Sequence, residues 1–167
     1  ANKAVRGTEL NPRVKHQEGF AIVGIAVRTS NAKEATDSLI GRQWGRLMQE
    51  NLLATVLNKA DRNIVAVYTD ASDKDGEYTY GLGARVTKVE NVPAGMIAKE
   101  GSAGRYSVLT SDRGVVQQVV LATWKRIWDT PKDAPGGDRI YKTDFEVYDE
   151  RARNSADSVM DVHVGIR

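Results

Sequence analysis

The sequence predicts an α+β fold in which one βαββ unit is used twice with pseudo-twofold symmetry. The first observation is a faint internal repeat, because residues 67–70 (Val-Tyr-Thr-Asp) line up with residues 147–150 (Val-Tyr-Asp-Glu) at an offset of 80. Three further pairs share this offset: Trp44 with Trp124, Arg46 with Arg126 and Gly24 with Gly104. The second observation is that each half carries alternating apolar stretches around one amphipathic segment, which is typical of strands that flank a helix.

The first half of the chain reads as a strand, a helix and a β-hairpin. Its opening stretch alternates loosely between apolar and polar residues, which indicates a strand with a kink at Gly24. Ser30 and Asn31 are N-cap candidates for the helix, whose apolar residues recur at helical spacing. A polar turn then separates two stretches rich in β-branched and aromatic residues. We expect these elements at residues 14–29, 32–50, 63–69 and 78–86.

The second half repeats this order after a seam at residues 92–95 (Val-Pro-Ala-Gly). We expect its first strand to break near residues 101–104, where glycines cluster. The polar segment 151–158 between the last two strands is expected to be mobile. The helix of this half presents an apolar face of Val120, Leu121, Trp124, Ile127 and Trp128. We expect the elements at residues 96–110, 113–129, 139–148 and 159–166.

A chain of 167 residues is long enough for one compact domain. We expect a flexible N-terminal tail over residues 1–13 and a single domain over residues 14–167, made of repeats at about 14–91 and 92–167. Antiparallel sheets and two helices, arranged around the pseudo-twofold axis, would enclose a central groove. Such an interface is a favoured place for a small-molecule pocket.

Composition excludes several classes of function. The formal net charge is only +2, so the basic stripe of a nucleic-acid binder is absent. The chain has no cysteine, which rules out disulfides, thiol catalysis and thiolate metal sites and fits a reducing cytoplasm. Two histidines far apart argue against a metal site or a catalytic triad. No apolar run reaches the roughly 18 residues of a membrane span. We therefore expect a cytoplasmic protein without a cofactor, metal or membrane partner.

Glu146 is the first candidate functional residue. It falls opposite Ala66 in the repeat, and an acid that is present in only one half is not a folding requirement of the unit. In a strand, Asp144 and Tyr148 would share its face. That face is either a solvated outer surface or the wall of a partly apolar groove. In a groove, a carboxylate without a cation would attract a cationic ligand by about 4 kcal/mol at ~4 Å, less the cost of desolvation.

Aromatic side chains gather on the strands and helices that should face each other. Tyrosines on a strand face suit a groove better than a core, because each hydroxyl needs a polar partner. Trp44 and Trp124 could equally be core residues, since they occupy the same place in both copies. Rings beside a single glutamate would hold an organic cation by cation–π contacts of roughly 0.5–2 kcal/mol each. The candidate ligand-binding residues are Glu146, Tyr68, Tyr80, Tyr148 and Trp124.

Several segments resemble those of a known family and follow one another in the same order as in that family. They are residues 20–25, the helix with Trp44, and residues 66–70, 77–83, 92–95, 104–106 and 143–149. Over residues 14–167 the chain is similar to the GyrI-like effector-binding domains at the C-terminal end of AraC-type and MerR-type multidrug regulators. It most resembles the stand-alone form carried on integron gene cassettes. The resemblance implies a duplicated βαββ fold with a groove between the halves. It also implies a groove carboxylate, at Glu146 here, that recognises lipophilic cations.

In those regulators a DNA-binding helical domain precedes the module, whereas about thirteen residues precede the first expected strand here. We therefore expect no direct nucleic-acid binding. The expected protein binds small organic, amphipathic cations, alone or with a separate regulatory partner, and could form a homodimer. Two alternatives stay open. A small-molecule hydrolase, as some relatives are, would use Glu146 as general base with a tyrosine hydroxyl as acid. A protein-interaction module would take a protein segment in the groove.

Overall fold

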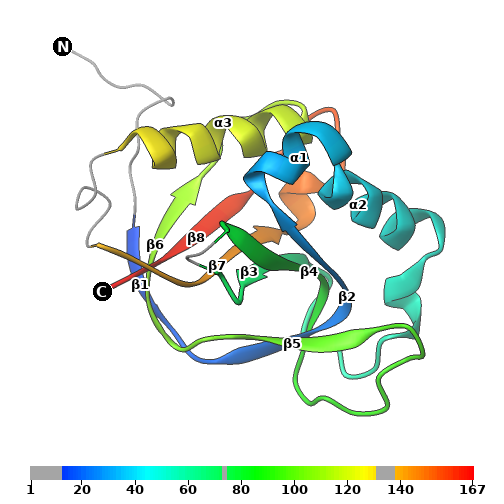
Figure 1. Cartoon of the computed structure of the whole chain (residues 1–167). Helices are drawn as coiled ribbons and strands as arrows, with labels where there is room; N and C mark the ends of the chain where they lie inside the picture. Colours follow the sequence, from blue (N-terminus) through cyan, green and yellow to red (C-terminus); the bar gives the residue numbers. More distant parts are fainter. Residues whose placement is uncertain (1–12, 73–74, 131–137) are drawn as a thin grey trace.

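The computed structural model describes residues 13–72, 75–130 and 138–167. The strands of this part are β1 (Arg13–Gln17), β2 (Phe20–Ser30), β3 (Ile64–Thr69), β4 (Glu77–Val86), β5 (Ile97–Gly101), β6 (Gly104–Thr110), β7 (Arg139–Tyr148) and β8 (Asp161–Ile166). The helices are α1 (Asn31–Asp37), α2 (Leu39–Gln49) and α3 (Val116–Asp129), with short 3-10 turns at Leu52–Thr55 and Glu150–Ala152. All eight strands join one antiparallel sheet in the order β1-β6-β8-β7-β3-β4-β2-β5, and the helices lie along one side of it (Figure 1).

The strand order is symmetric about the β3–β7 pair, at the centre of the sheet. Ala66 pairs directly with Glu146, and these two residues are also counterparts at the repeat offset of 80. The pseudo-twofold axis therefore passes through this pair. The register of β3 with β4 recurs at the same offset in β7 with β8. The predicted duplicated α+β fold is confirmed, but as one continuous sheet rather than separate sheets.

The glycine match between the halves is wrong. Gly24 pairs with Gly83, whose counterpart in β8 is His163, and His163 pairs with Val108. The counterpart of Gly24 is therefore Val108 and not Gly104. The two paired glycines serve a close approach, because a Cβ on either would meet the backbone of the neighbouring strand at 2.0–2.2 Å. Strand β2 runs unbroken through Gly24.

The opening strand of each repeat is divided into two strands, and these two strands pair with different halves of the molecule. Strands β1 and β2 are separated by residues 18–19, yet β1 pairs with β6 while β2 pairs with β4 and β5. Strand β5 likewise pairs with β2, whereas β6 pairs with β8. Each half thus supplies an edge strand to the other, which ties the repeats together. Of the expected tail, Arg13 already belongs to β1, and residues 1–12 lie outside the described part.

The single helix predicted for the first half is instead two. Ser38 has a left-handed backbone with φ 51°, which ends α1 and starts α2 in a new direction. Ser30 caps α1, since its hydroxyl accepts a hydrogen bond from the Lys33 amide at 3.1 Å. Glu34 reaches forward to accept from the amide of Ile40 at 3.0 Å and so caps α2.

Helix α3 is turned relative to the predicted apolar face. Leu121 and Trp128 are each 49% exposed, although both were expected to be buried. Val119 and Thr123 lie on the buried side instead, together with Trp124. The hydroxyl of Thr123 donates to the Val119 carbonyl at 2.7 Å, which allows a polar residue to sit there.

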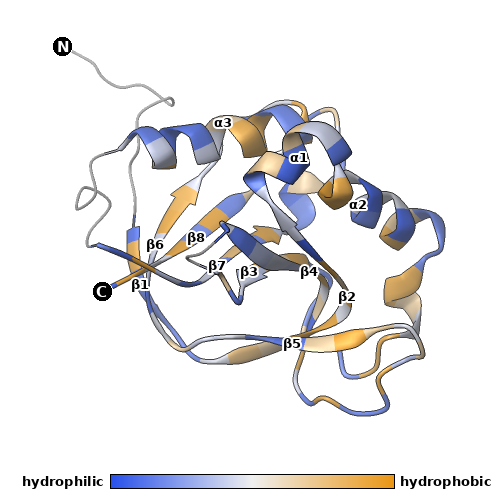
Figure 2. Cartoon of the chain, viewed as in Figure 1, coloured by the Kyte–Doolittle hydropathy of each residue, from blue (hydrophilic) through white to orange (hydrophobic). Residues whose placement is uncertain are grey.

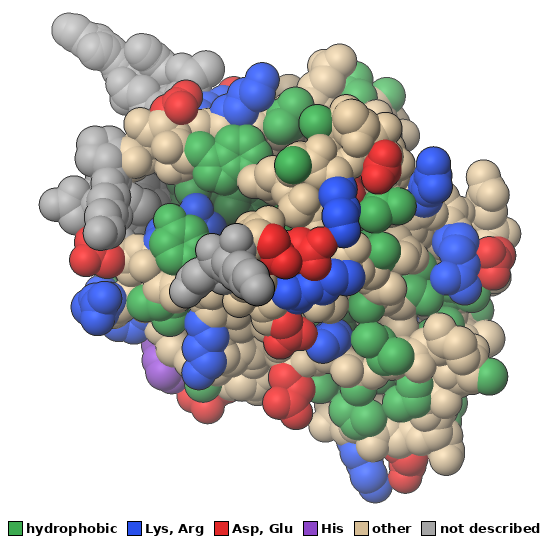
Figure 3. Space-filling view, in the orientation of Figure 1, with side chains coloured by type: hydrophobic (Ala, Val, Ile, Leu, Met, Phe, Trp, Pro, Cys, Tyr) green, Lys and Arg blue, Asp and Glu red, His purple; other side chains and the backbone are tan. Residues whose placement is uncertain are grey.

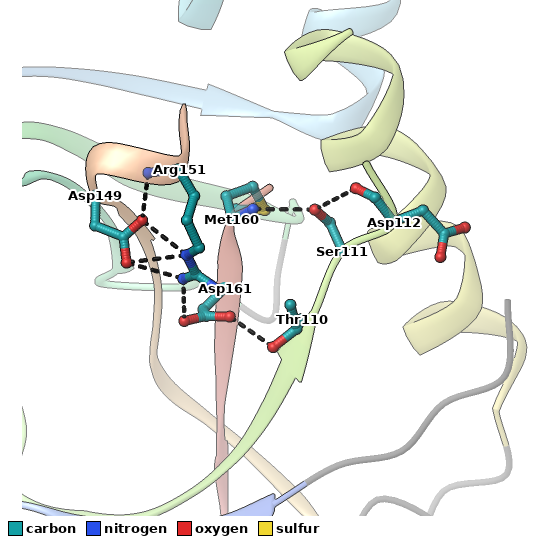
Figure 4. A network of polar contacts seen from close by, with 7 residues as sticks. All are labelled: Thr110, Ser111, Asp112, Asp149, Arg151, Met160 and Asp161. Carbon is teal, nitrogen blue, oxygen red and sulfur yellow. Dashed lines mark hydrogen bonds and ion pairs between the residues drawn. The ribbon is translucent and has the colours of Figure 1, made fainter. Parts of the chain in front are cut away.

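The segment after β7 is held by an ion-pair network, which argues against its predicted mobility. Arg151 donates to Asp149 at 2.9 Å and to Asp161, on β8, at 2.8 Å (Figure 4). The second oxygen of Asp161 accepts from the Thr110 hydroxyl at 2.7 Å. Because these contacts join β6, β8 and the end of β7, they fix the strand that carries Glu146 against its neighbours.

Apolar residues, many of them in the strands (orange in Figure 2), form clusters on both faces of the central strands. The larger cluster lies between the sheet and the helices and includes Leu47, Leu82, Trp124, Ile127 and Val162. The smaller cluster lies on the opposite face and consists of Ile22, Val65, Val67, Tyr106 and Phe145, with Phe20 and Val147 against it. Glu146 alternates with the residues of the smaller cluster, so its side chain belongs to the helix-facing side.

Candidate functional site

Glu146 is a charged residue at the centre of the molecule. It is 1% exposed, in the middle of β7 and on the pseudo-twofold axis. A solvated outer face is therefore excluded. A buried carboxylate is costly unless hydrogen bonds or a counter-charge offset the loss of water.

The carboxylate of Glu146 is held by three neutral donors from three elements. The Tyr68 hydroxyl on β3 and the Trp124 indole Nε1–H on α3 each donate to Oε2 at 2.7 Å. The Tyr148 hydroxyl, further along β7, donates to Oε1 at 2.6 Å. Among the residues that the structure describes, no lysine, arginine or histidine forms an ion pair with this carboxylate. The site thus satisfies the hydrogen-bonding capacity of an anion without neutralising its charge.

Protonation equilibria follow from this burial. Burial raises the pKa of Glu146 above its usual value, and the hydrogen bonds from Tyr148, Trp124 and Tyr68 offset part of that rise. Burial, then the nearby charge of Glu146, raise the pKa of both Tyr68 and Tyr148 well above 10. The phenols therefore stay protonated as donors across the physiological range, while the acid becomes easier to protonate than an exposed glutamate.

Aromatic rings surround the carboxylate on the helix-facing side. Tyr68 packs against Trp124, Tyr80 and Tyr78 at centroid distances of 5.3, 5.1 and 5.5 Å. On the other flank, Trp44 meets Tyr148 edge-on at 4.7 Å. These distances suit edge-to-face aromatic packing. We call Glu146, Trp44, Tyr68, Tyr78, Tyr80, Trp124 and Tyr148 the aromatic cluster.

The five sequence candidates do come together, but not in equal roles. Tyr68, Trp124 and Tyr148 bond directly to Glu146. Tyr80 is one step removed, because its hydroxyl accepts from the Trp44 indole at 2.8 Å. Sequence reasoning left out Trp44 and Tyr78 as site residues. The repeat offered a signal for Trp44, since it is the counterpart of Trp124.

The predicted central groove is filled by these side chains. Tyr80, Trp124 and Tyr148 are buried beside the acid, whereas Trp44, Tyr68 and Tyr78 are half-buried and form the outer side of the cluster. A surface hollow of about 470 Å³ lies elsewhere, next to β2 and β5, and shares no lining residue with the cluster. That hollow lacks a buried charge, so the chemistry favours Glu146 as the site even though rings must move to reach it.

Other site classes find little support in the described residues. No group of three or more histidine, cysteine, aspartate or glutamate side chains there could hold a metal ion. Positive and negative side chains are interspersed on the face shown in Figure 3, without one dominant sign. None of the helices in the described part is long and apolar enough to cross a membrane.

Comparisons with known proteins agree with this picture. A family model described as integron-associated effector binding protein matches residues 13–166. The chain is 30% identical over 158 residues to protein YobU of Bacillus subtilis (strain 168), which carries a provisional name as a transcriptional regulator; the match covers 92% of this chain and 96% of YobU.

Two solved structures share the fold. The integron cassette protein VCH_CASS2, from the mobile metagenome of Vibrio cholerae, has a TM-score of 0.67 at 23% identity and covers 93% of this chain and 95% of its own. The structure of SAV2435 bound to tetraphenylphosphonium has a TM-score of 0.75 at 16% identity, with 94% of both chains covered. The family model and the match to YobU confirm the family predicted from the sequence, and the two solved structures agree in fold.

Proposed function

Since the chain belongs to the family of integron-associated effector binding proteins, we propose that its effectors are small, amphipathic organic cations and that Glu146 is their counter-charge. The observation that carries the proposal is the state of this residue. It is a buried carboxylate with three neutral donors and no ion-pair partner among the described residues.

The energetics favour a cationic ligand over a neutral one. A buried charge without a partner is unfavourable in the protein alone, and a ligand cation would supply the missing attraction at low dielectric. Desolvation of both charges takes back part of this gain, so we expect a net effect well below the roughly 4 kcal/mol of the bare pair. The surrounding rings add cation–π and apolar contact, which favours cations with aromatic or alkyl substituents.

Entry to the acid requires a rearrangement of side chains. The half-buried rings of Trp44, Tyr68 and Tyr78 lie between solvent and the buried part of the cluster. Tyr78 is held by a single hydrogen bond to Asn31 at 3.1 Å, among the contacts described. We expect a ligand to displace these outer rings. The buried donors Trp124 and Tyr148 would stay hydrogen-bonded to Glu146. Aromatic rings that move as units can adapt to ligands of several shapes.

Tetraphenylphosphonium is a suitable first probe, because SAV2435 has been crystallised with it. Intrinsic tryptophan fluorescence should report binding, since Trp44 and Trp124 belong to the cluster. The matched pair is Glu146→Gln, which removes the charge, and Glu50→Gln, which makes the same change at an exposed position at the end of α2. We expect saturable quenching in the native protein and in Glu50→Gln, and a loss of affinity of roughly tenfold or more in Glu146→Gln.

Circular dichroism is the control for folding, because Gln keeps the size of the side chain. Equal affinity of the native protein and Glu146→Gln, with both folded, would reject Glu146 as the counter-charge. Loss of binding in both glutamine variants would point to a general effect of the substitutions instead.

The hydrolase alternative is weaker on the same geometry. Glu146 could serve as a general base, but the raised pKa of Tyr68 and Tyr148 makes both phenols poor general acids. Prolonged incubation of a bound ligand, followed by analysis for products, separates the two functions, and turnover would favour the enzyme. A separate regulatory partner or a homodimer remains a prediction, for which size-exclusion chromatography with light scattering is the measurement.

A further inference from the structure

A second carboxylate lies beside the proposed site and is neutralised by an internal cation. Asp144 is two residues before Glu146 in the regular part of β7, so both occupy the same side of the strand. It is 7% exposed. Its Oδ2 accepts from the Arg139 guanidinium at 2.7 Å, and its Oδ1 accepts from the Gly165 amide at 2.9 Å. The ion-paired side chains are 16% and 10% exposed, so solvent screens this pair weakly.

Arg139 also contacts the aromatic cluster. Its guanidinium carbon lies 5.8 Å from the ring centroid of Trp124, the residue that donates to Glu146. The same carbon lies 4.4 Å from the ring centroid of Tyr141. These distances are those of cation–π contacts. Arg139 therefore combines a carboxylate with aromatic faces, which is the arrangement that we propose for a ligand cation at Glu146.

The start of β7 is shaped to bring Arg139 back onto Asp144. The pairing of β7 with β8 shifts register between these residues, and Tyr141 between them has a left-handed φ of 56°. A non-glycine residue adopts that conformation only at a cost, which the surrounding contacts must offset. The irregularity places residues 139 and 144 within ion-pair distance across five positions, which a regular strand would separate by roughly 16 Å.

We propose that Arg139 sets the charge selectivity of the site. By neutralising Asp144 it leaves Glu146 as the single counter-charge, so the protein favours ligands with one positive charge over dications. The inference rests on the proposed function, because it concerns the same site. Without the guanidinium, two carboxylates would lie roughly 7 Å apart along one side of the strand, a spacing that suits a ligand with two cationic centres.

Four proteins vary the charge of the site in steps. Relative to the native protein, Arg139→Gln adds one negative charge, Asp144→Asn removes one, and the double variant restores the native sum. The probes are a matched pair: the monocation 1-ethyl-4-phenylpyridinium and the dication 1,1′-diethyl-4,4′-bipyridinium, which share a rigid two-ring frame. Calorimetric titrations are run at pH 8, because burial raises the pKa of Asp144 even when Arg139 is present.

The measured quantity is the ratio of dication affinity to monocation affinity. We expect Arg139→Gln to raise this ratio by about tenfold or more, Asp144→Asn to lower it, and the double variant to return it to the native value within about threefold. Glu146→Gln should weaken both probes, since it removes the counter-charge that they share. If Arg139→Gln does not fold, the lowered ratio in Asp144→Asn carries the test.

The outcomes separate this inference from the proposed function. A native protein that binds the monocation, with an unchanged ratio in Arg139→Gln and Asp144→Asn, overturns the role of Arg139 and leaves the function of Glu146 intact. A native protein that binds neither these probes nor tetraphenylphosphonium overturns both. A raised ratio that persists in the double variant would also reject the inference, because the effect would then not depend on the charge of Asp144.

Discussion

The two halves of the molecule build the same frame, but only the second half places an acid in it. In the second half the Trp124 indole donates to Glu146, whereas in the first half the equivalent Trp44 indole donates to the Tyr80 hydroxyl. The position equivalent to Glu146 is Ala66, which is 0% exposed. The tryptophan of the first half thus donates to a phenol oxygen, that of Tyr80, and the tryptophan of the second half donates to a carboxylate, that of Glu146.

The register of β3 with β7 explains why only one of the two repeats carries the acid. Ala66 and Glu146 are direct neighbours across β3 and β7, so their Cβ atoms are about 5 Å apart. Two glutamates there would place like charges side by side in a buried site, which is strongly unfavourable. A site on the axis of a duplicated fold can therefore hold one acid and draw donors from both halves. Tyr68 comes from the first half, and Trp124 and Tyr148 come from the second.

A second acid on the axis should cause the largest effect. We expect Ala66→Glu to lower the free energy of unfolding by about 3 kcal/mol or more at neutral pH, because it overfills a packed position and adds a buried charge. Urea titration followed by circular dichroism measures the loss. Stability close to that of the native protein would mean that the two positions are not in close contact.

The exchanged variant, Ala66→Glu with Glu146→Ala, sharpens this comparison. The repeat counterparts of the three donors are Tyr148, Trp44 and Tyr68, so a glutamate at position 66 should find equivalent hydrogen bonds. We expect the exchange to recover more than half of the stability lost in Ala66→Glu and to bind tetraphenylphosphonium within about tenfold of the native protein. An exchanged variant as unstable as Ala66→Glu alone would show that the halves are not interchangeable at the axis.

The two tryptophans offer a matched pair with a smaller effect. Trp124→Phe removes a donor from the buried carboxylate, which should cost about 1–3 kcal/mol of unfolding free energy and weaken cation binding. Trp44→Phe removes the bond to Tyr80 and part of the edge contact with Tyr148, but no donor to Glu146. It should cost about 1 kcal/mol less than Trp124→Phe, with cation affinity within about threefold of native. Denaturant titration and calorimetry measure both quantities. A larger loss of affinity in Trp44→Phe would place the ligand nearer the first half.

A pH dependence gives the smallest predicted effect. Because the folded protein raises the pKa of Glu146 above 4.5, the folded state binds more protons than the unfolded state between 4.5 and the raised value. The stability contributed by protonated Glu146 is thus lost as the pH rises through this window. Native protein should therefore lose stability relative to Glu146→Gln as the pH rises from 4.5 to 7.5, which urea titrations of both proteins at each pH would measure.

Comparing the two proteins at each pH removes the contribution of shared groups. His163 is one such group, because burial lowers its pKa to about 4 and its own contribution falls as the pH drops below 6.5. A constant stability difference between native protein and Glu146→Gln across the range would show that the acid titrates normally. Cation affinity should also fall at low pH in the native protein only.

Much of the fold could be predicted from the sequence because its strands are rich in β-branched and aromatic residues and polar turns separate them. This composition predicted β3, β4 and β7 with correct ends or ends within one residue. Glu146 could be identified from the internal repeat, because the counterpart position in the other half is an alanine, Ala66. That signal needs only the sequence, since counterpart positions in a duplicated fold share an environment.

The errors arose where long-range contacts overrule local pattern. Ser38 adopts a left-handed conformation that no neighbouring residue predicts, so one expected helix became two. Leu121 and Trp128 are apolar yet exposed, whereas Val119 and Thr123 occupy the buried side of α3. The two halves form one sheet because β3 pairs with β7. The predicted groove is filled because the aromatic rings pack against one another. Neither leaves a periodic mark in the sequence.

The most direct test of Glu146 as the counter-charge varies the charge of the ligand and the charge at position 146 together. Native protein and Glu146→Gln are each titrated with 1-ethyl-4-phenylpyridinium and with its neutral isostere 4-ethylbiphenyl, at pH 8. We predict that the native protein prefers the cation by roughly tenfold to a hundredfold. Glu146→Gln should lose most of this preference, while its affinity for the neutral compound stays within about threefold. The same preference for the cation in both proteins would contradict a counter-charge at Glu146.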